Sequence, residues 1–190
     1  MHYINKKYKM SEQDIVKGCI KGDRNAQKQL YEKYGGYLFG ICYRYLGNWK
    51  YAEDLLHYSL ITIFTHFSQF KWKGEDSLKA WTVQVVKNTI LMYLREQKYW
   101  IETDDLIEAM NIEDSGEGET SDIPYDVLIS MIAELPTRFR VIFNMYIIDG
   151  LSHKEISKAL GIKEKSSSSQ LAKAKAMMIK KINIWREKNK

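Results

Sequence analysis

Apolar residues recur at every third or fourth position along most of this 190-residue chain, the spacing that gathers them on one face of an α-helix. In the first half this pattern predicts helices over residues 11–20, 23–46, 51–70 and 78–98, with Gly22 and Gly47 as breaks. Strand-like alternation is scarce, and only two prolines occur. The pattern therefore predicts an all-α fold.

Four shorter helices are predicted after residue 123. The first runs over 124–134, and the second begins near Pro136. The apolar face that follows comprises Phe139, Ile142, Phe143, Tyr146 and Ile147. The last two helices are predicted to form a helix-turn-helix. Ser152 and Glu155 have the capping-box spacing of a helix start, Gly161 ends that helix, and another follows over 164–182.

The outward face of the last helix is polar and basic. It comprises Ser166, Ser168, Ser169, Gln170, Lys173 and Lys175. In DNA-binding helix-turn-helix units the second helix lies in the major groove, where hydroxyls and amides reach base edges and lysines hold phosphates. The stretch therefore predicts DNA binding; the alternative is an ordinary helical hairpin with a solvated lysine face.

Charge is segregated along the chain, whose net charge is +5. Residues 1–101 carry 16 Lys and Arg against 9 Asp and Glu, residues 102–134 carry 11 acids and no Lys or Arg, and residues 135–190 carry 13 bases against 4 acids. Two basic bodies around an acidic connector are typical of a protein that binds a polyanion through two surfaces. We therefore predict a basic tail at 1–10, two small helical domains at 11–100 and 124–190, and an acidic flexible linker at 101–123.

A loop at 71–79 mixes aromatic and basic side chains, among them Lys71, Trp72 and Lys73. The helix after it can direct further polar side chains outward, namely Gln84, Lys87, Asn88, Arg95 and Lys98. Aromatic rings beside cations suit unstacked single-stranded bases, because rings offer stacking surface and cations hold the backbone. Aromatic residues in helical proteins are more often core, so that alternative stays open.

Several classes of function are disfavoured. The longest uncharged run, residues 55–70, is too polar to span a membrane, and the N-terminus lacks the pattern of a secretory signal, so we expect a cytoplasmic protein. Cys19 and Cys42 fall in apolar helical patterns and are expected to be buried reduced thiols. No metal-ligand spacing or Gly-rich phosphate loop occurs, so we expect no catalytic residues, no metal site, no cofactor and no enzymatic activity.

Three motifs, in order and at the right spacing, resemble bacterial RNA polymerase sigma factors of the sigma-70 family, extracytoplasmic-function (ECF) group. The first, Ala52-Glu53-Asp54-Leu55 continuing to residue 64, is similar to the helix that docks on the clamp coiled coil of the largest polymerase subunit. The second, residues 81–88 and 93–95, is similar to the helix that meets the −10 promoter element. The third, residues 135–136 and 150–175, is similar to the domain that reads the −35 element.

The resemblance implies a sigma factor that binds the polymerase core and directs promoter-specific initiation. It assigns core-polymerase binding to Glu53, Asp54, Leu55, His57 and Tyr58. It assigns capture of a flipped −10 base to the 71–79 loop, and −10 DNA binding to Lys71, Trp72, Lys73, Gln84, Lys87, Asn88 and Arg95. It assigns −35 DNA binding to Lys165, Ser166, Ser168, Ser169, Gln170, Ala172 and Lys173.

The implied partners are the RNA polymerase core, promoter DNA and an anti-sigma factor, soluble or membrane-bound, with no small-molecule substrate. The chain departs from the family pattern at His57 and Tyr58, and it carries Lys173 where arginine is usual. Lysine cannot form arginine's bidentate fork, so readout there is expected to be less sharp. The alternative function is an autonomous helix-turn-helix transcriptional regulator with an N-terminal sensing or dimerisation domain.

Overall fold

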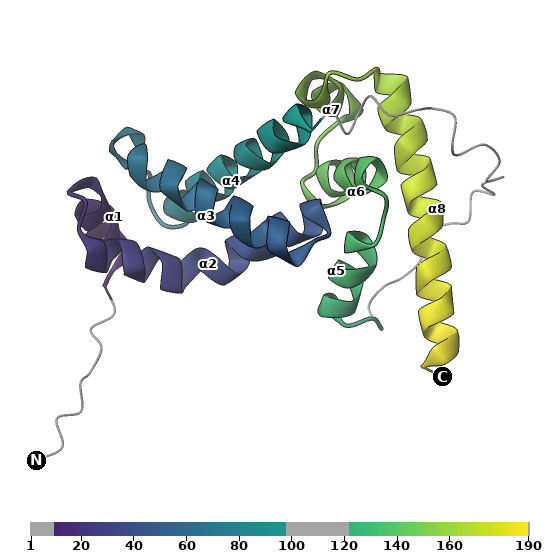
Figure 1. Cartoon of the computed structure of the whole chain (residues 1–190), viewed down its shortest axis with the longest axis horizontal. Coiled ribbons are helices and arrows are strands. Elements are labelled where there is room, and N and C mark those ends of the chain that lie inside the picture. The colour runs from purple at the N-terminus through teal and green to yellow at the C-terminus, as the bar shows by residue number, and fades with distance from the viewer. Residues whose placement is uncertain (1–9, 98–121, 190) are drawn as a thin grey trace, which may run out of the picture. The chain divides into compact units, whose positions relative to one another are not determined.

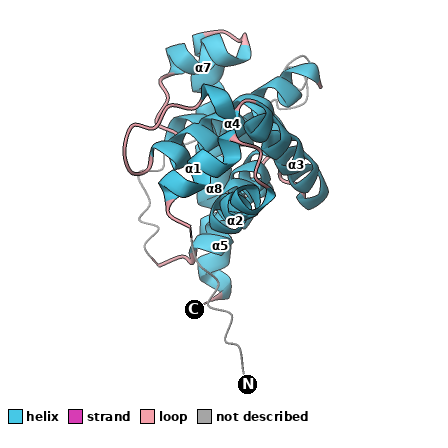
Figure 2. Ribbon diagram, turned by 90° about the vertical axis from the view of Figure 1, so that its left-hand side faces the viewer, coloured by secondary structure: helices cyan, strands magenta, loops and turns pink. Residues whose placement is uncertain are grey.

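The computed structural model describes residues 10–97 and 122–189, and every regular element in them is a helix (Figure 2). The elements, of which Figure 1 labels the α-helices, are α1 (Glu12–Ile20), α2 (Arg24–Leu46), α3 (Trp49–Thr65), the 3₁₀ turn η1 (Phe67–Gln69), α4 (Ser77–Glu96), α5 (Tyr125–Ala133), α6 (Thr137–Phe143), the π-helical η3 (Asn144–Ile148), α7 (His153–Leu160) and α8 (Glu164–Lys188). The predicted all-α class is confirmed. Most of the predicted linker, 101–121, lies outside the described residues.

The chain divides into two compact units. Among the described residues, 10–42 and 53–89 form the N-terminal unit, and 43–52, 90–97 and 122–189 form the C-terminal unit. The end of α2 and the α2–α3 turn thus group with the C-terminal helices, because side chains of α6 and η3 bind their backbone carbonyls. The domain ranges 11–100 and 124–190 stay predictions.

In the N-terminal unit, α1 packs closely on α2. The hydroxyl of Ser11 caps α1 by accepting a bond from the Asp14 backbone N–H at 3.2 Å. A Cβ at Gly18 would lie 2.4 Å from the Cβ of Ala26, so only glycine permits this approach. Cys19 is a buried free thiol, as predicted, and burial raises its pKa to about 11.

Cys42 is the second free thiol of the N-terminal unit. It is also buried, as predicted, and burial raises its pKa to about 12.

The C-terminal unit has an apolar core between α5, α6 and α8. It comprises Ile123, Met131, Ile132, Leu135, Phe139, Ala174, Met178 and Ile182. Ile123 falls in the predicted linker but is buried, and the neighbouring Asp122 pairs with Arg186 at 2.7 Å. Two residues that the sequence assigned to the linker, Asp122 and Ile123, therefore belong to the folded part of this unit.

A buried polar cluster supports the same unit. The Arg140 guanidinium is 6% exposed and donates hydrogen bonds to the carbonyls of Tyr45 (2.9 Å), Leu46 (2.7 Å), Ala133 (2.8 Å) and Leu135 (2.6 Å), and to the hydroxyl of Thr137 (3.1 Å). Beside it, Asp149 accepts bonds from Arg44 at 2.8 Å and from the Tyr45 hydroxyl at 2.6 Å. Burial, followed by the Asp149 carboxylate, raises the pKa of Tyr45.

The apolar face predicted after Pro136 is correct only up to Phe143. Tyr146 and Ile147 are 36% and 45% exposed, contrary to the prediction. The helix widens to π geometry over η3, which places an extra residue in the turn and rotates these side chains away from the core. The turn is held by Asn144, whose amide donates to the Arg44 carbonyl at 2.9 Å.

Within residues 10–97 and 122–189, none of the helices combines the length and the apolar character needed to cross a bilayer.

Candidate nucleic-acid interface

The predicted helix-turn-helix is present as α7 and α8. The Ser152 hydroxyl accepts a bond from the Glu155 backbone N–H, and the Glu155 carboxylate accepts one from the Ser152 N–H at 2.8 Å, which completes the capping box. Hydrogen bonds from the side chain and then the backbone of Ser152 lower the pKa of Glu155. Gly161 adopts φ 70°, and the Ser157 hydroxyl donates to the Ile162 carbonyl at 2.6 Å, so the turn is closed before α8 begins.

A contact that the sequence analysis missed fixes α7 against α8. Ser167, between two residues predicted to bind DNA, is fully buried. Its hydroxyl lies 2.9 Å from the Nδ1 atom of His153, whose ring stacks on Tyr146 with centroids 4.5 Å apart. Through these contacts the three residues hold α8 against α7 and η3. The sequence signal for the inward position of Ser167 is its spacing of four residues from Leu171, which is also buried.

The residues predicted to bind the −35 element follow one surface of α8. Lys165, Ser168, Ser169 and Ala172 are exposed, and Ser166, Gln170 and Lys173 are partly buried. The Ser169 hydroxyl donates to the Ser166 carbonyl at 3.1 Å. The Gln170 Oε1 atom is buried without a hydrogen-bond partner in the described structure. The surface therefore offers hydroxyl, amide and ammonium groups, the chemical groups that can contact base edges and phosphates.

In the N-terminal unit, the loop between η1 and α4 is compact. Lys71 and Lys73 are exposed, while Trp72 is partly buried. The Ser77 hydroxyl donates to the Gly74 carbonyl at 2.6 Å and accepts the Lys73 backbone N–H at 3.3 Å, which draws the loop into a tight turn.

Asp76, next to Ser77, has φ 62°. This left-handed conformation is unusual for a residue other than glycine and indicates local strain, which concentrates at functional sites.

The aromatic rings near this loop have different surroundings. The ring of Trp81 lies 5.2 Å from those of Phe67 and Phe70, so these three rings pack together. Trp72 lies outside that cluster and lines an open pocket. Both tryptophans are partly buried, but Trp81 packs against core rings whereas Trp72 faces the pocket.

The outward residues of α4 lie in both units. In the N-terminal unit, Gln84 and Asn88 are exposed and joined by a 2.9 Å hydrogen bond, and Lys87 is partly buried. In the C-terminal unit, the exposed Arg95 guanidinium donates to the Ala159 carbonyl near the end of α7, with Nε at 2.9 Å. The Arg95 guanidinium is therefore already hydrogen-bonded within the protein in this structure.

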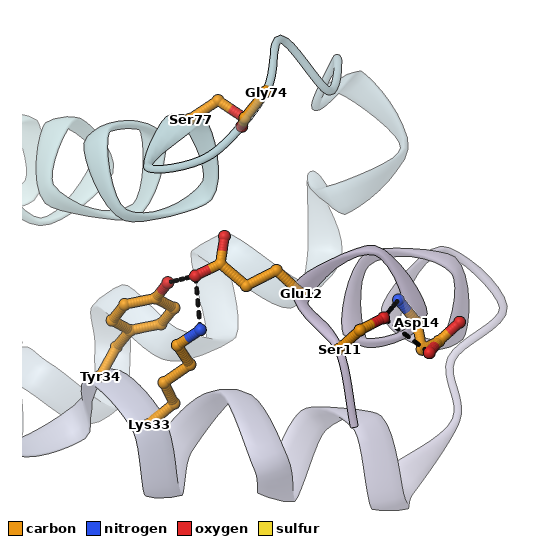
Figure 3. A network of polar contacts seen from close by, with 7 residues as sticks. All are labelled: Ser11, Glu12, Asp14, Lys33, Tyr34, Gly74 and Ser77. Carbon is orange, nitrogen blue, oxygen red and sulfur yellow. Dashed lines mark hydrogen bonds and ion pairs between the residues drawn. The ribbon is translucent and has the colours of Figure 1, made fainter. Parts of the chain in front are cut away.

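The pocket beside Trp72 has a volume of about 430 Å³ and lies wholly in the N-terminal unit. It is lined by Ser11, Glu12, Gln13, Lys33, Trp72, Glu75 and Asp76. Glu12 accepts hydrogen bonds from Lys33 and from the Tyr34 hydroxyl, both at 2.5 Å (Figure 3). The bond from Lys33, followed by that from Tyr34, lowers the pKa of Glu12, whereas burial raises the pKa of Tyr34. No motif in the sequence connects α1 or α2 with this pocket.

The predicted polymerase-binding residues lie on α3. Glu53, Asp54, His57 and Tyr58 are exposed, but Leu55 is 8% exposed and belongs to the buried face. Ile61, three residues after Tyr58 on the exposed face, is 64% exposed and was missed. Its position off the inward apolar pattern was the sequence signal that it lies at the surface.

Among residues 10–97 and 122–189, no three His, Cys, Asp or Glu side chains are close enough together to hold a metal ion.

Comparisons with known proteins match both parts of the chain. Residues 30–99 match the sigma-70 region 2 family, and residues 125–178 match the sigma-70 region 4 family, so together the two matches cover more than half of the chain.

Individual relatives have the same assignment. The chain is 27% identical over 126 residues to the ECF RNA polymerase sigma factor SigM of Bacillus subtilis, covering 65% of this chain and 75% of the relative. It is 26% identical over 163 residues to SigW of the same organism, covering 77% and 83%. Among solved structures, the chain matches one from the complex of the sigma factor RpoE with the anti-sigma factor NepR from Bartonella quintana. The two chains are 15% identical, the match covers 83% of this chain and 96% of that one, and the TM-score is 0.47.

Proposed function

Because the chain belongs to the sigma-70 family of RNA polymerase sigma factors, in its extracytoplasmic-function group, we propose roles for its surfaces in promoter recognition. The protein is a sigma factor that binds the polymerase core and directs promoter-specific initiation. The observation that carries this conclusion is the match to region 2 followed by region 4, with a closed helix-turn-helix in the second.

The exposed face of α8 reads the −35 element. The exposed Ser168, Ser169 and Ala172 contact base edges, while Lys165 and Lys173 hold phosphates. Ser166 and Gln170 flank them. The buried contact between His153 and Ser167 supports this role, because it fixes the helix that enters the groove.

The loop around Trp72 captures a base that has left the stack of the −10 element. Unstacking costs a few kcal/mol, which a ring platform and cations can offset. Trp72 provides the platform, and Lys71 and Lys73 hold the backbone. Further contacts are assigned to Gln84, Lys87, Asn88 and Arg95, the last of which must first release the Ala159 carbonyl.

The exposed face of α3 binds the clamp coiled coil of the largest polymerase subunit. Glu53 and Asp54 supply charge, His57 and Tyr58 supply polar and aromatic contacts, and Ile61 adds apolar area. Leu55 supports this face from below. Polymerase core, promoter DNA and an anti-sigma factor are the partners, the protein acts in the cytoplasm, and the polymerase performs the chemistry, so no enzymatic activity is assigned to this chain.

In vitro transcription with core polymerase and a randomised promoter library tests this function, because only a sigma factor selects promoters in that mixture. Lys173→Glu should reduce transcription that depends on the −35 element by about tenfold or more, since it replaces an attractive phosphate contact by a repulsive one. It should leave polymerase binding intact.

Lys188→Glu, the same charge change at the last residue of α8, is the matched control and should be near wild type. Loss of both polymerase binding and transcription in Lys173→Glu would contradict the assignment of α8.

A further inference from the structure

The pocket beside Trp72 contains an acceptor that no described residue satisfies. Glu12 uses Oε1 for both Lys33 and Tyr34. Its Oε2 is buried without a hydrogen-bond partner, and Figure 3 shows it pointing away from these two residues toward the segment that carries Gly74 and Ser77. A buried acceptor of this kind carries a desolvation penalty, which a donor supplied by a ligand would remove.

The carboxylate is held in place before any ligand arrives. The side chain of Glu12 is 18% exposed, and two donors from α2 fix its orientation. Since little side-chain freedom remains to be lost on binding, the free oxygen can discriminate between ligands by the group that they present to it.

The charges of the pocket restrict the ligand. Three carboxylates, from Glu12, Glu75 and Asp76, line it against the single ammonium of Lys33, so a phosphate would be repelled. A hydrogen-bond donor would be attracted. The partly buried Trp72 ring on the same wall offers a stacking surface, and about 430 Å³ accommodates one nucleobase.

We propose that Glu12 makes this pocket select a base with an exocyclic amino group, cytosine or adenine, over thymine. Cytosine N4 and adenine N6 each carry an amino group that can donate to Oε2. Thymine has the O4 carbonyl at the corresponding place, and that oxygen would face the carboxylate without a proton between them. The inference rests on the proposed capture of an unstacked −10 base by the loop.

Entry of the base requires a local rearrangement around Glu12. In this structure Oε2 is shielded from solvent, so the amino group reaches it only after the atoms that cover it shift. Gly74 and Asp76, both with positive φ, place a permissive residue and a strained one in this loop.

The test uses the protein bound to core polymerase and a fluorescent non-template-strand oligonucleotide spanning the −10 element of a promoter selected from the random library. Each cytosine in turn is replaced by 2-pyrimidinone, and each adenine by purine, so that only the amino group is removed. At one position of the oligonucleotide, removal of the amino group should lower the affinity of the wild-type holoenzyme by about tenfold, as expected for the loss of one hydrogen bond to a charged acceptor. Glu12→Gln should reduce that loss to about twofold or less.

Two further variants separate base reading from local damage. Asp14→Asn makes the same chemical change two residues away, outside the pocket, and should keep the tenfold discrimination. Tyr34→Phe removes one of the two donors that orient Glu12 but keeps the carboxylate, so it should weaken the discrimination less than Glu12→Gln does. A Glu12→Gln variant that still discriminates tenfold, or a wild type that is indifferent to the amino group at every position, would overturn the proposal. If the proposed function itself is wrong, the wild-type holoenzyme will not transcribe from the selected promoter, and this result is measured independently of the base preference.

Discussion

Removal of the buried guanidinium of Arg140 is expected to destabilise the C-terminal unit strongly. Its donors satisfy four backbone carbonyls and one hydroxyl, and the side chain is 6% exposed. Hydrogen bonds to charged groups contribute about 1.5–3 kcal/mol each, but the desolvation of the guanidinium offsets part of that sum. Arg140→Leu leaves several carbonyls without this donor, so we expect a loss of about 3–5 kcal/mol.

Equilibrium denaturation followed by circular dichroism measures this loss. Arg186→Leu is the matched control, because Arg186 pairs with Asp122 at the surface and such pairs contribute about 0–1 kcal/mol. Arg140→Lys keeps the charge but cannot reach all the acceptors, so it should fall between the two. If Arg140→Leu cost no more than Arg186→Leu, the cluster would not be what holds residues 44–46 to α6.

Two further predictions concern the proposed DNA surfaces. Ser152→Ala removes the capping box and should destabilise the protein by about 1 kcal/mol near neutral pH, measured by denaturant unfolding. The pKa of Glu155 is lower in the folded protein than its unfolded value of 4.5. The stability that its hydrogen bonds with Ser152 contribute is therefore present above pH 4.5 and is lost as the pH falls through the folded-state pKa. The difference in stability between Ser152→Ala and wild type should accordingly become smaller in acid. Trp72→Ala should reduce promoter opening several-fold by loss of base stacking, measured as permanganate reactivity of −10 thymines. Unchanged reactivity would remove the loop from the site, and Lys17→Ala, an exposed change on α1, serves as control.

Local signals predicted most of the helices because capping and periodicity act within a few residues. Ser152 and Glu155 form the predicted capping box, and Gly161 adopts the left-handed conformation expected at a helix end. The order of helices and the helix-turn-helix therefore follow from spacing alone. Prediction was wrong at Tyr146 and Ile147, because the π turn depends on a hydrogen bond from Asn144 to a carbonyl a hundred residues away.

The missed parts of the candidate sites depend on contacts between distant segments. Arg140 has the sequence signature of a solvated residue, and only the carbonyls around it explain its burial. Glu12 and Lys33 are far in sequence from Trp72, so no motif connects them to the pocket that they share. Periodicity also cannot indicate that the buried Ser167 binds His153.

The affinity of the chain for RNA polymerase core tests the central claim most directly, because an autonomous regulator needs no such contact. We expect wild type to bind the core, and Asp54→Ala to weaken binding by about tenfold, since the exposed carboxylate lies on the proposed clamp-binding face of α3. Glu187→Ala, which removes an exposed carboxylate near the end of α8, should bind like wild type. Absence of core binding by wild type would contradict the account, and binding unaffected by Asp54→Ala would contradict the assignment of α3.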